Sequence, residues 1–142
     1  MPLVLATLIL SLFLISPIER VDRDPQQRLV GRYLGTSSFV ADNPADQGYS
    51  DTTGIWFIFE DSTYYYGEGD TLPEPDDAGD GGGAYEATDS TVSLNGAYPK
   101  ILRPVIVLRG TFLCEFSGDT LVMIQPTGET VDGGHHLHLV RQ

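Results

Sequence analysis

Residues 105–125 read VIVLRGTFLCEFSGDTLVMIQ, and this stretch decides the fold. Two runs rich in apolar and β-branched residues flank residues 117–119, Ser-Gly-Asp, and such a short connection containing glycine is typical of a β-hairpin. In the second run, Leu121, Met123 and Gln125 would lie on one face of a strand, because successive side chains of a strand alternate between faces. The stretch therefore predicts two antiparallel strands.

The chain after residue 28 has the same character throughout. Gly, Pro and Asp/Asn clusters separate short β-type runs, and no segment has an apolar stripe at helical spacing. The pattern predicts eight strands, over residues 29–40, 55–59, 63–66, 83–88, 91–94, 105–116, 120–125 and 136–141. Because closure removes the unpaired edges of a sheet, we expect an all-β fold, an eight-stranded antiparallel up-and-down barrel. Such a barrel is filled by its own side chains or holds one small ligand.

The first residues of the chain are expected to lie outside this domain. Residues 3–15 form a nearly continuous apolar run, shorter than the about 20 residues that span a bilayer and similar in length to the core of a signal peptide. We interpret residues 1–18 as a signal peptide or N-terminal anchor, 19–28 as a polar linker and 29–142 as the barrel domain. The alternative is a buried first helix or strand. The first interpretation predicts an exported protein, secreted or periplasmic, that touches membrane only if the leader is kept.

The charge of the chain limits its partners. Between Arg32 and Lys100 there is no basic residue, yet this stretch holds thirteen Asp and Glu residues and most of the net charge of −12. Nucleic acid and anionic lipid headgroups are repelled by such a surface, so we expect no nucleic-acid partner. Cations, basic proteins and neutral small molecules remain as possible partners. The single cysteine, Cys114, cannot form an intramolecular disulfide, and its apolar surroundings predict a small buried hydrophobe.

Four stretches together resemble the small bacterial type of lipocalin-like (calycin) domain. Residues 29–33, LVGRY, are similar to the Leu-x-Gly-x-Trp opening of that family, with tyrosine in place of tryptophan. Residues 56–64, WFIFEDSTY, residues 83–86, GAYE, and a closing hairpin over residues 119–141 are similar to its later motifs. The resemblance implies a barrel that binds a small apolar molecule. It also implies that Arg141, at the end of the closing strand, packs over an aromatic ring at the closed end.

Aromatic and cationic side chains are the candidate ligand contacts. The aromatic hairpin over residues 56–66 offers either one wall of a ligand cavity or ordinary core and cross-strand packing. Core packing is the favoured interpretation for the tryptophan of this hairpin. An arginine in a strand would meet a ligand carboxylate if it faced the cavity. The residues predicted to bind a ligand are Tyr33, Trp56, Tyr65, Tyr85 and Arg109.

Two clusters suggest a metal site, and in both a simpler interpretation is favoured. Residues 67–83 are rich in glycine and in carboxylates, which suit Ca²⁺, but their spacing departs from the calcium-loop pattern, so a solvated flexible loop is expected. His136 and His138 share one face of the last strand and follow His135, but two imidazoles normally need a third ligand. We interpret all three as polar residues on the solvent face. The sequence thus predicts neither a metal site nor a cofactor.

The motifs of known enzyme classes are missing from the sequence. There is no nucleophile elbow, phosphate-cradling glycine loop or zinc-protease motif, so we expect no enzyme. The favoured function is an exported lipocalin-like barrel that binds or carries a small, largely apolar molecule. The alternative is an interaction or structural protein, in which the barrel is filled and the acidic loops contact a basic partner or surface component. The sequence leaves open whether the barrel is hollow and whether the protein self-associates.

Overall fold

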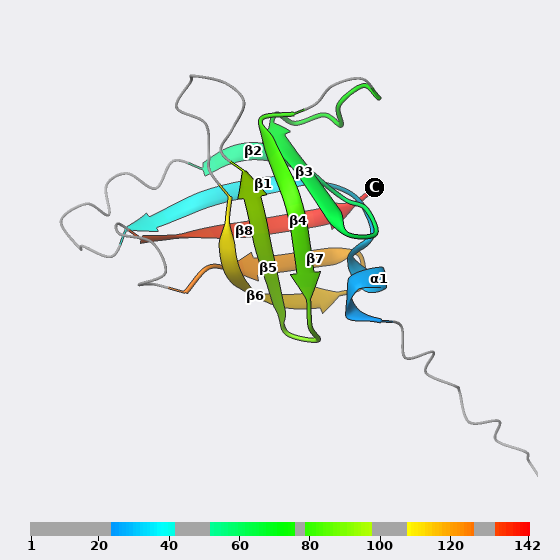
Figure 1. Ribbon diagram of the computed structural model, residues 1–142. Helices are drawn as coiled ribbons and strands as arrows, with labels where there is room; N and C mark the ends of the chain where they lie inside the picture. The colour runs from blue at the N-terminus through cyan, green and yellow to red at the C-terminus, as the bar shows by residue number, and fades with distance from the viewer. Residues whose placement is uncertain (1–23, 42–51, 76–78, 98–107, 127–132) are drawn as a thin grey trace, which may run out of the picture.

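The computed structural model describes residues 24–41, 52–75, 79–97, 108–126 and 133–142, which form a closed all-β barrel of eight antiparallel strands (Figure 1). The strands follow one another around the barrel in sequence order, and the last pairs with the first. One short helix precedes them. The elements are α1 (Pro25–Leu29), β1 (Gly31–Ala41), β2 (Thr52–Phe59), β3 (Thr63–Glu68), β4 (Gly81–Ala87), β5 (Thr91–Ala97), β6 (Gly110–Ser117), β7 (Thr120–Ile124) and β8 (Gly133–Arg141).

The predicted barrel and its tight hairpins are confirmed. Short connections join β2 to β3, β4 to β5 and β6 to β7, as the sequence indicated. Gly118, in the last of these turns, has a φ of 61°, which explains the glycine there. The predicted alternation in β8 is confirmed as well, because Leu137 and Leu139 are buried and His138 is exposed.

Some strands are longer than predicted, because pairing with neighbours extends them. β2 begins at Thr52, since the eleven-residue β1 offers it partners as far as Ser38. β4 begins at Gly81, inside the stretch expected to be a loop. A Cβ on Gly81 would lie 2.5 Å from Oη of Tyr66, so the glycine lets β4 pass close over that ring.

The chain before β1 differs from the expected polar linker. Asp24 caps α1 by accepting a hydrogen bond from the backbone N–H of Gln26 at 3.0 Å, and Pro25 occupies the first helical position, where proline is well tolerated. Leu29, which is buried, is the last residue of α1, and β1 therefore begins at Gly31, two residues later than predicted. The predicted leader, residues 1–18, lies outside the described residues. Within the described part of the chain, no helix is long and apolar enough to cross a membrane.

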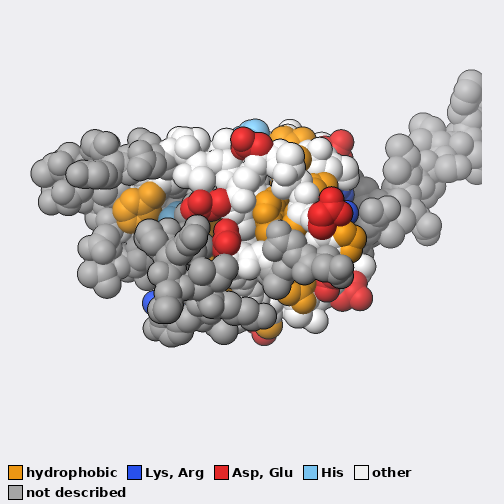
Figure 2. Space-filling model, turned by 90° about the horizontal axis from the view of Figure 1, so that it is seen from above, with side chains coloured by type: hydrophobic (Ala, Val, Ile, Leu, Met, Phe, Trp, Pro, Cys, Tyr) orange, Lys and Arg blue, Asp and Glu red, His pale blue; other side chains and the backbone are white. Residues whose placement is uncertain are grey.

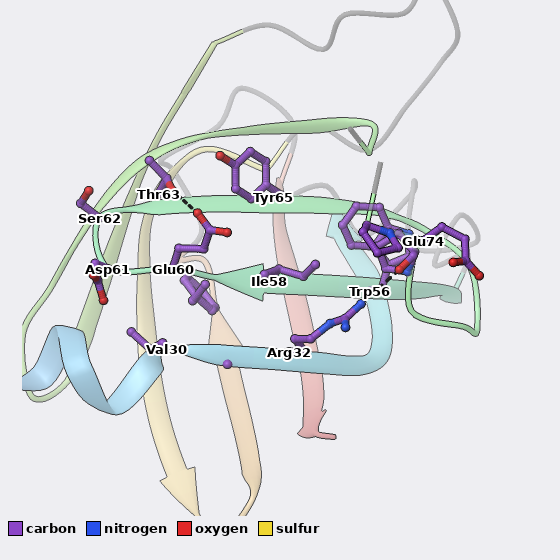
Figure 3. A pocket seen from close by; sticks show the side chains of 14 residues that line it. Val30, Arg32, Trp56, Ile58, Glu60, Asp61, Ser62, Thr63, Tyr65 and Glu74 are labelled. Carbon is purple, nitrogen blue, oxygen red and sulfur yellow. Dashed lines mark hydrogen bonds between the residues drawn. The ribbon is translucent and has the colours of Figure 1, made fainter. Parts of the chain in front are cut away.

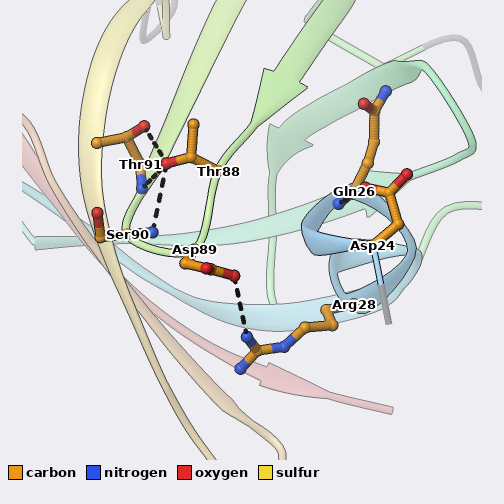
Figure 4. A network of polar contacts seen from close by, with 7 residues as sticks. All are labelled: Asp24, Gln26, Arg28, Thr88, Asp89, Ser90 and Thr91. Atoms are coloured by element: carbon orange, nitrogen blue, oxygen red, sulfur yellow. Dashed lines mark hydrogen bonds and ion pairs between the residues drawn. The ribbon is translucent and has the colours of Figure 1, made fainter. Parts of the chain in front are cut away.

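Polar contacts organise the chain around α1 and the β4–β5 turn (Figure 4). Arg28 and Asp89 approach to 3.9 Å, but both side chains are exposed, so this ion pair contributes at most about 1 kcal/mol. In the turn, the hydroxyls of Thr88 and Thr91 lie 2.7 Å apart, and the N–H of Thr91 donates to Oγ1 of Thr88 at 3.0 Å. The two threonines therefore close the turn, and the ion pair links the turn to α1.

Aromatic rings fill the middle of the barrel. Phe57 stacks on Phe59, Tyr64 and Tyr66, with ring centroids 4.6, 5.6 and 5.8 Å away. Oη of Tyr64 donates to the carbonyl of Leu108 at 2.9 Å, and the N–H of Leu108 donates to Oη of Tyr66 at 3.1 Å. Each phenol thus has its polar end satisfied while its ring occupies the interior.

The interior side chains of the described strands leave no room for a ligand in the middle of the barrel. A side chain that lines a void the size of a water molecule keeps some exposed surface. The following interior side chains, from seven of the eight strands, have an exposed fraction of 0%: Tyr33, Ile55, Phe57, Tyr64, Val92, Phe112, Leu121, Met123 and Leu139. The barrel is filled along this section, which is one of the two possibilities for eight strands.

The end of the barrel next to α1 is closed by Tyr33 and Arg141. The guanidinium of Arg141 lies over the Tyr33 ring, 5.3 Å from its centroid, and Nε and Nη2 donate to the phenol oxygen at 3.2 and 2.6 Å. Tyr33 in turn donates to the carbonyl of Leu29 at 2.8 Å, and Nη2 also contacts the carbonyl of Arg28. The packing expected of Arg141 is confirmed, and it ties α1 to β1 and β8.

Replacing Arg141 with alanine should lower the free energy of unfolding by about 2 kcal/mol, because a partly buried cation–π contact and its hydrogen bonds are lost. The free energy of unfolding of Arg141→Lys should lie between those of wild type and Arg141→Ala. Lysine keeps the positive charge but lacks the planar guanidinium group. Urea unfolding followed by circular dichroism measures both values. Equal midpoints for wild type and Arg141→Ala would contradict a closing role.

Candidate functional site

A groove lies on the outer face of β1, β2 and β3 (Figure 3). Its floor is a row of three residues, because Arg32 pairs with Ile58 across β1 and β2, and Ile58 pairs with Tyr65 across β2 and β3. All three point outward, since the residues beside them in each strand face the core. Ile58 is half-buried and Tyr65 is 38% exposed.

The chain that follows β3 folds back and forms one wall of the groove. The N–H of Gly69 donates to the carbonyl of Gly54 at 3.0 Å, and Nη2 of Arg32 donates to the carbonyl of Pro73 at 3.1 Å. Asp80 accepts a hydrogen bond from the N–H of Glu68 at 2.8 Å. The described parts of residues 67–83 are therefore attached to the barrel, unlike the solvated loop that the sequence indicated.

Trp56 lies between the barrel and this returning chain, with 4% of its surface exposed. Two glycines make room for its indole. A Cβ on Gly67 would lie 2.5 Å from Cζ2 of Trp56, and a Cβ on Gly79 would lie 2.3 Å from its Cη2. Trp56 is buried, as expected of a packing residue, but it packs on the outside of the barrel under the returning chain and is not part of the interior cluster.

Three carboxylates stand at the two ends of the groove. Glu60 and Asp61 belong to the β2–β3 turn at one end, and Glu74 stands at the other end beside Trp56 (Figure 3). All three are exposed. Oγ1 of Thr63 donates to Oε2 of Glu60 at 3.3 Å, which helps to hold that carboxylate over the groove. Among the described residues that line the groove, Arg32 is the only cation against three carboxylates, so this lining has a net negative charge.

The size and lining of the groove suit binding. Its volume is about 900 Å³, which is within the range of ligand sites. Ile58 and Tyr65 give the floor an apolar and aromatic part beside Arg32, and the carboxylates stand at the rim. Ligand sites usually combine apolar surface with a few polar groups in this way. Figure 2 shows that Asp and Glu side chains are also spread over one face of the molecule, with apolar side chains between them.

The five residues predicted to bind a ligand do not meet in one cavity. Trp56 and Tyr65 line the groove. Tyr33 and Tyr85 face the inside of the barrel, where both are buried and their hydroxyls donate to backbone carbonyls. Arg109 precedes β6 and is exposed. A ligand in the groove would therefore contact only the first two.

Several groove residues were missed by the sequence analysis, among them Arg32, Ile58 and Glu74. The alternation of β1 and β2 contained a signal for the first two, because Ile58 lies between two core residues and Arg32 precedes a core residue in its strand. For residues 73–75 there was no such signal. Their position depends on how the returning chain packs over Trp56, which no local pattern encodes.

At the end of the barrel away from α1, two buried polar atoms have no hydrogen-bond partner in the structure as described: Oγ of Ser37 and Nδ1 of His135. Both residues lie at inward positions, because Ser37 pairs with the buried Leu137, and His135 pairs with Phe39, with ring centroids 5.2 Å apart. Burial, with a smaller effect of the neighbouring His136, lowers the pKa of His135 and so favours a neutral imidazole. An unpaired buried polar group calls for an explanation, of which a bound water or ion is one.

The histidines of β8 divide between its two faces. His136 and His138 share the outer face, but His135 points inward, so the expectation that all three face solvent is wrong for His135. In the part of the chain that the structure describes, no group of three His, Cys, Asp or Glu residues could hold a metal ion. Cys114 is half-buried against the core, and burial raises the pKa of its thiol.

Comparisons of the chain with protein-family models, curated proteins and solved structures found no match.

Replacing Gly67 with alanine should displace the Trp56 indole, because the new methyl group would overlap the ring. Trp56 is the sole tryptophan, so its fluorescence reports this site alone. We expect the emission maximum of Gly67→Ala to shift to the red and acrylamide quenching to increase. Leu113→Ala, on the exposed outer face of β6, is the control and should leave both unchanged. Wild-type emission from Gly67→Ala would show that Trp56 does not pack against Gly67.

Proposed function

We propose that this protein is a non-enzymatic interaction protein whose barrel is a filled scaffold and whose acidic outer surface contacts a basic partner. The observation that carries the proposal is the interior itself, where side chains from seven strands have no exposed surface. A ligand as large as a fatty acid has no space among them. Binding therefore belongs on the outside, where the groove and most of the excess carboxylates are.

The electrostatics of the chain support a basic partner. The net charge of −12 attracts cationic molecules from a distance and speeds their encounter. The described carboxylates of the groove are exposed, so their attraction is screened by salt. Binding should consequently weaken as the ionic strength rises.

The proposal includes an exported location and kinship with lipocalin-like domains. The apolar run of residues 3–15 supports export. The contact of Arg141 with Tyr33 at the end next to α1 agrees with the arrangement that the resemblance implies. Neither depends on the identity of the partner.

A second candidate function is carriage of a small, largely apolar molecule. The specific observation in its favour is the unpaired Ser37 Oγ and His135 Nδ1 at the end of the barrel away from α1. A molecule with one polar group could satisfy both atoms there. We rank this candidate second because the interior next to these residues is filled, with Ile55 and Leu137 at 0% and 1% exposed.

Two probes separate the candidates. We expect a fluorescein-labelled hexa-arginine peptide to bind at about 0.02 M salt and to lose at least tenfold in affinity at about 0.5 M salt, as measured by fluorescence polarisation. A hexa-glutamate peptide is the control and should not bind. Oleic acid should leave the melting temperature unchanged. Stoichiometric oleic-acid binding together with no binding of hexa-arginine would overturn the proposal in favour of carriage.

A further inference from the structure

The groove has a length and a direction that restrict its occupant. It runs along β2 from Trp56, next to Glu74, to Glu60 in the turn (Figure 3). Four residue steps of a strand cover about 13 Å. An extended peptide of five residues has the same span between its first and last Cα atoms.

The carboxylates of the groove are divided between its ends, and its middle offers two apolar or aromatic side chains beside Arg32. Glu60 and Asp61 stand at one end and Glu74 at the other, with Ile58 and Tyr65 between them. A ligand that matches this pattern has a cation at each end and an apolar group in the centre. A cationic side chain that crosses the Tyr65 ring would gain a cation–π contact as well.

Arg32 favours a peptide over a simple organic dication. Its guanidinium has five N–H donors, and among the described residues it makes one hydrogen bond, to the carbonyl of Pro73 at 3.1 Å. A guanidinium accepts no hydrogen bond, so its ligand must supply an acceptor. The backbone carbonyls of an extended peptide supply acceptors without adding negative charge to an acidic groove.

We infer that the groove binds an extended segment of a partner protein with the pattern basic-x-apolar-x-basic. In an extended chain, residues i, i+2 and i+4 point to the same side, so the two basic side chains would reach the acidic ends and the apolar one would lie on Ile58. The inference rests on the proposed function, because it gives the site and the sequence pattern of the basic partner.

The test uses labelled pentapeptides and full-length protein. Arg-Ser-Leu-Ser-Arg, acetylated and amidated, should bind at least tenfold more tightly than Arg-Ser-Ser-Ser-Arg, which lacks the apolar group. Its affinity should also exceed that of Arg-Arg-Leu-Ser-Ser, which has the same composition but has its two charges on adjacent residues. Binding should change the fluorescence of Trp56, the sole tryptophan.

Variants locate the site. Ile58→Ala, Tyr65→Ala and the double change Glu60→Gln with Asp61→Asn should each weaken binding of Arg-Ser-Leu-Ser-Arg about tenfold. Two matched controls on other faces should change it less than twofold: Leu113→Ala, and Glu86→Gln with Glu115→Gln, whose side chains are exposed and do not line the groove. Circular dichroism establishes that each variant is folded.

The outcomes separate this inference from the proposed function. Binding that is sensitive to salt, but equal for the three pentapeptides and unchanged in the groove variants, would overturn the groove inference. The proposal of a basic partner would still hold. If neither pentapeptide nor hexa-arginine binds, both fail. Preference for the spaced peptide, lost in the groove variants and kept in the controls, supports both.

Discussion

Raising the pH above 10 should unfold this protein cooperatively, because four buried phenols hold their protons more tightly in the folded protein than in the unfolded chain. Tyr33, Tyr64, Tyr66 and Tyr85 are at most 3% exposed. Burial raises the pKa of each above the ordinary value of 10.0, and that of Tyr85 to about 12. Their contribution to stability is therefore complete below pH 10 and is lost as the pH rises, since the unfolded state releases its protons first.

The expected effect is large. Between pH 10 and the pKa of the folded state, each of these phenols reduces the free energy of unfolding by about 1.4 kcal/mol per pH unit. Tyrosinate absorbance from these four of the seven tyrosines should then rise together with the loss of the far-ultraviolet circular dichroism signal. Tyr64→Phe, which removes one ionising group, should reduce the slope. Complete tyrosine ionisation in a protein that keeps its strand signal would contradict a packed interior.

Phe57→Ala should reduce the free energy of unfolding by about 3–5 kcal/mol. The ring is fully buried and stacks on three other aromatic rings, so its removal leaves a cavity with rigid walls. The measurement is urea unfolding at neutral pH, with Leu113→Ala, an exposed site, expected to change stability by less than about 0.5 kcal/mol. A loss below about 1 kcal/mol for Phe57→Ala would mean that the surroundings already contain free space.

Most of the fold could be predicted from the sequence because strands and hairpins leave local signals. The alternation of Leu137 with His138 indicates a strand with one buried face, and Gly118 indicates a tight turn. Both features depend only on neighbouring residues. The part that was missed depends on distant contacts. The sequence predicted a loop at Gly81, but the structure has a strand there. A glycine is needed in this strand because it passes close to the Tyr66 ring, a contact that the sequence does not reveal.

The site was harder to predict than the fold. An aromatic residue in a barrel can face inward or outward, and Tyr33 and Tyr65 carry the same side chain on opposite faces. The wall formed by Pro73 depends on contacts between distant parts of the chain, such as the hydrogen bond from Arg32, forty-one residues away in sequence. The resemblance to ligand carriers predicts a site in the interior, whereas the groove lies on the outer face of β1, β2 and β3.

In this proposal, the barrel is filled and the ligand binds on its outside. Methyl NMR of the two isoleucines of β2 tests both statements most directly. Ile55 is an interior residue at 0% exposed, and Ile58 is three positions later on the groove floor. On titration with Arg-Ser-Leu-Ser-Arg, the δ1 methyl resonance of Ile58 should move and that of Ile55 should stay in place. Movement of the Ile55 and Leu137 resonances, with Ile58 unchanged, would put the ligand inside the barrel and contradict the proposal.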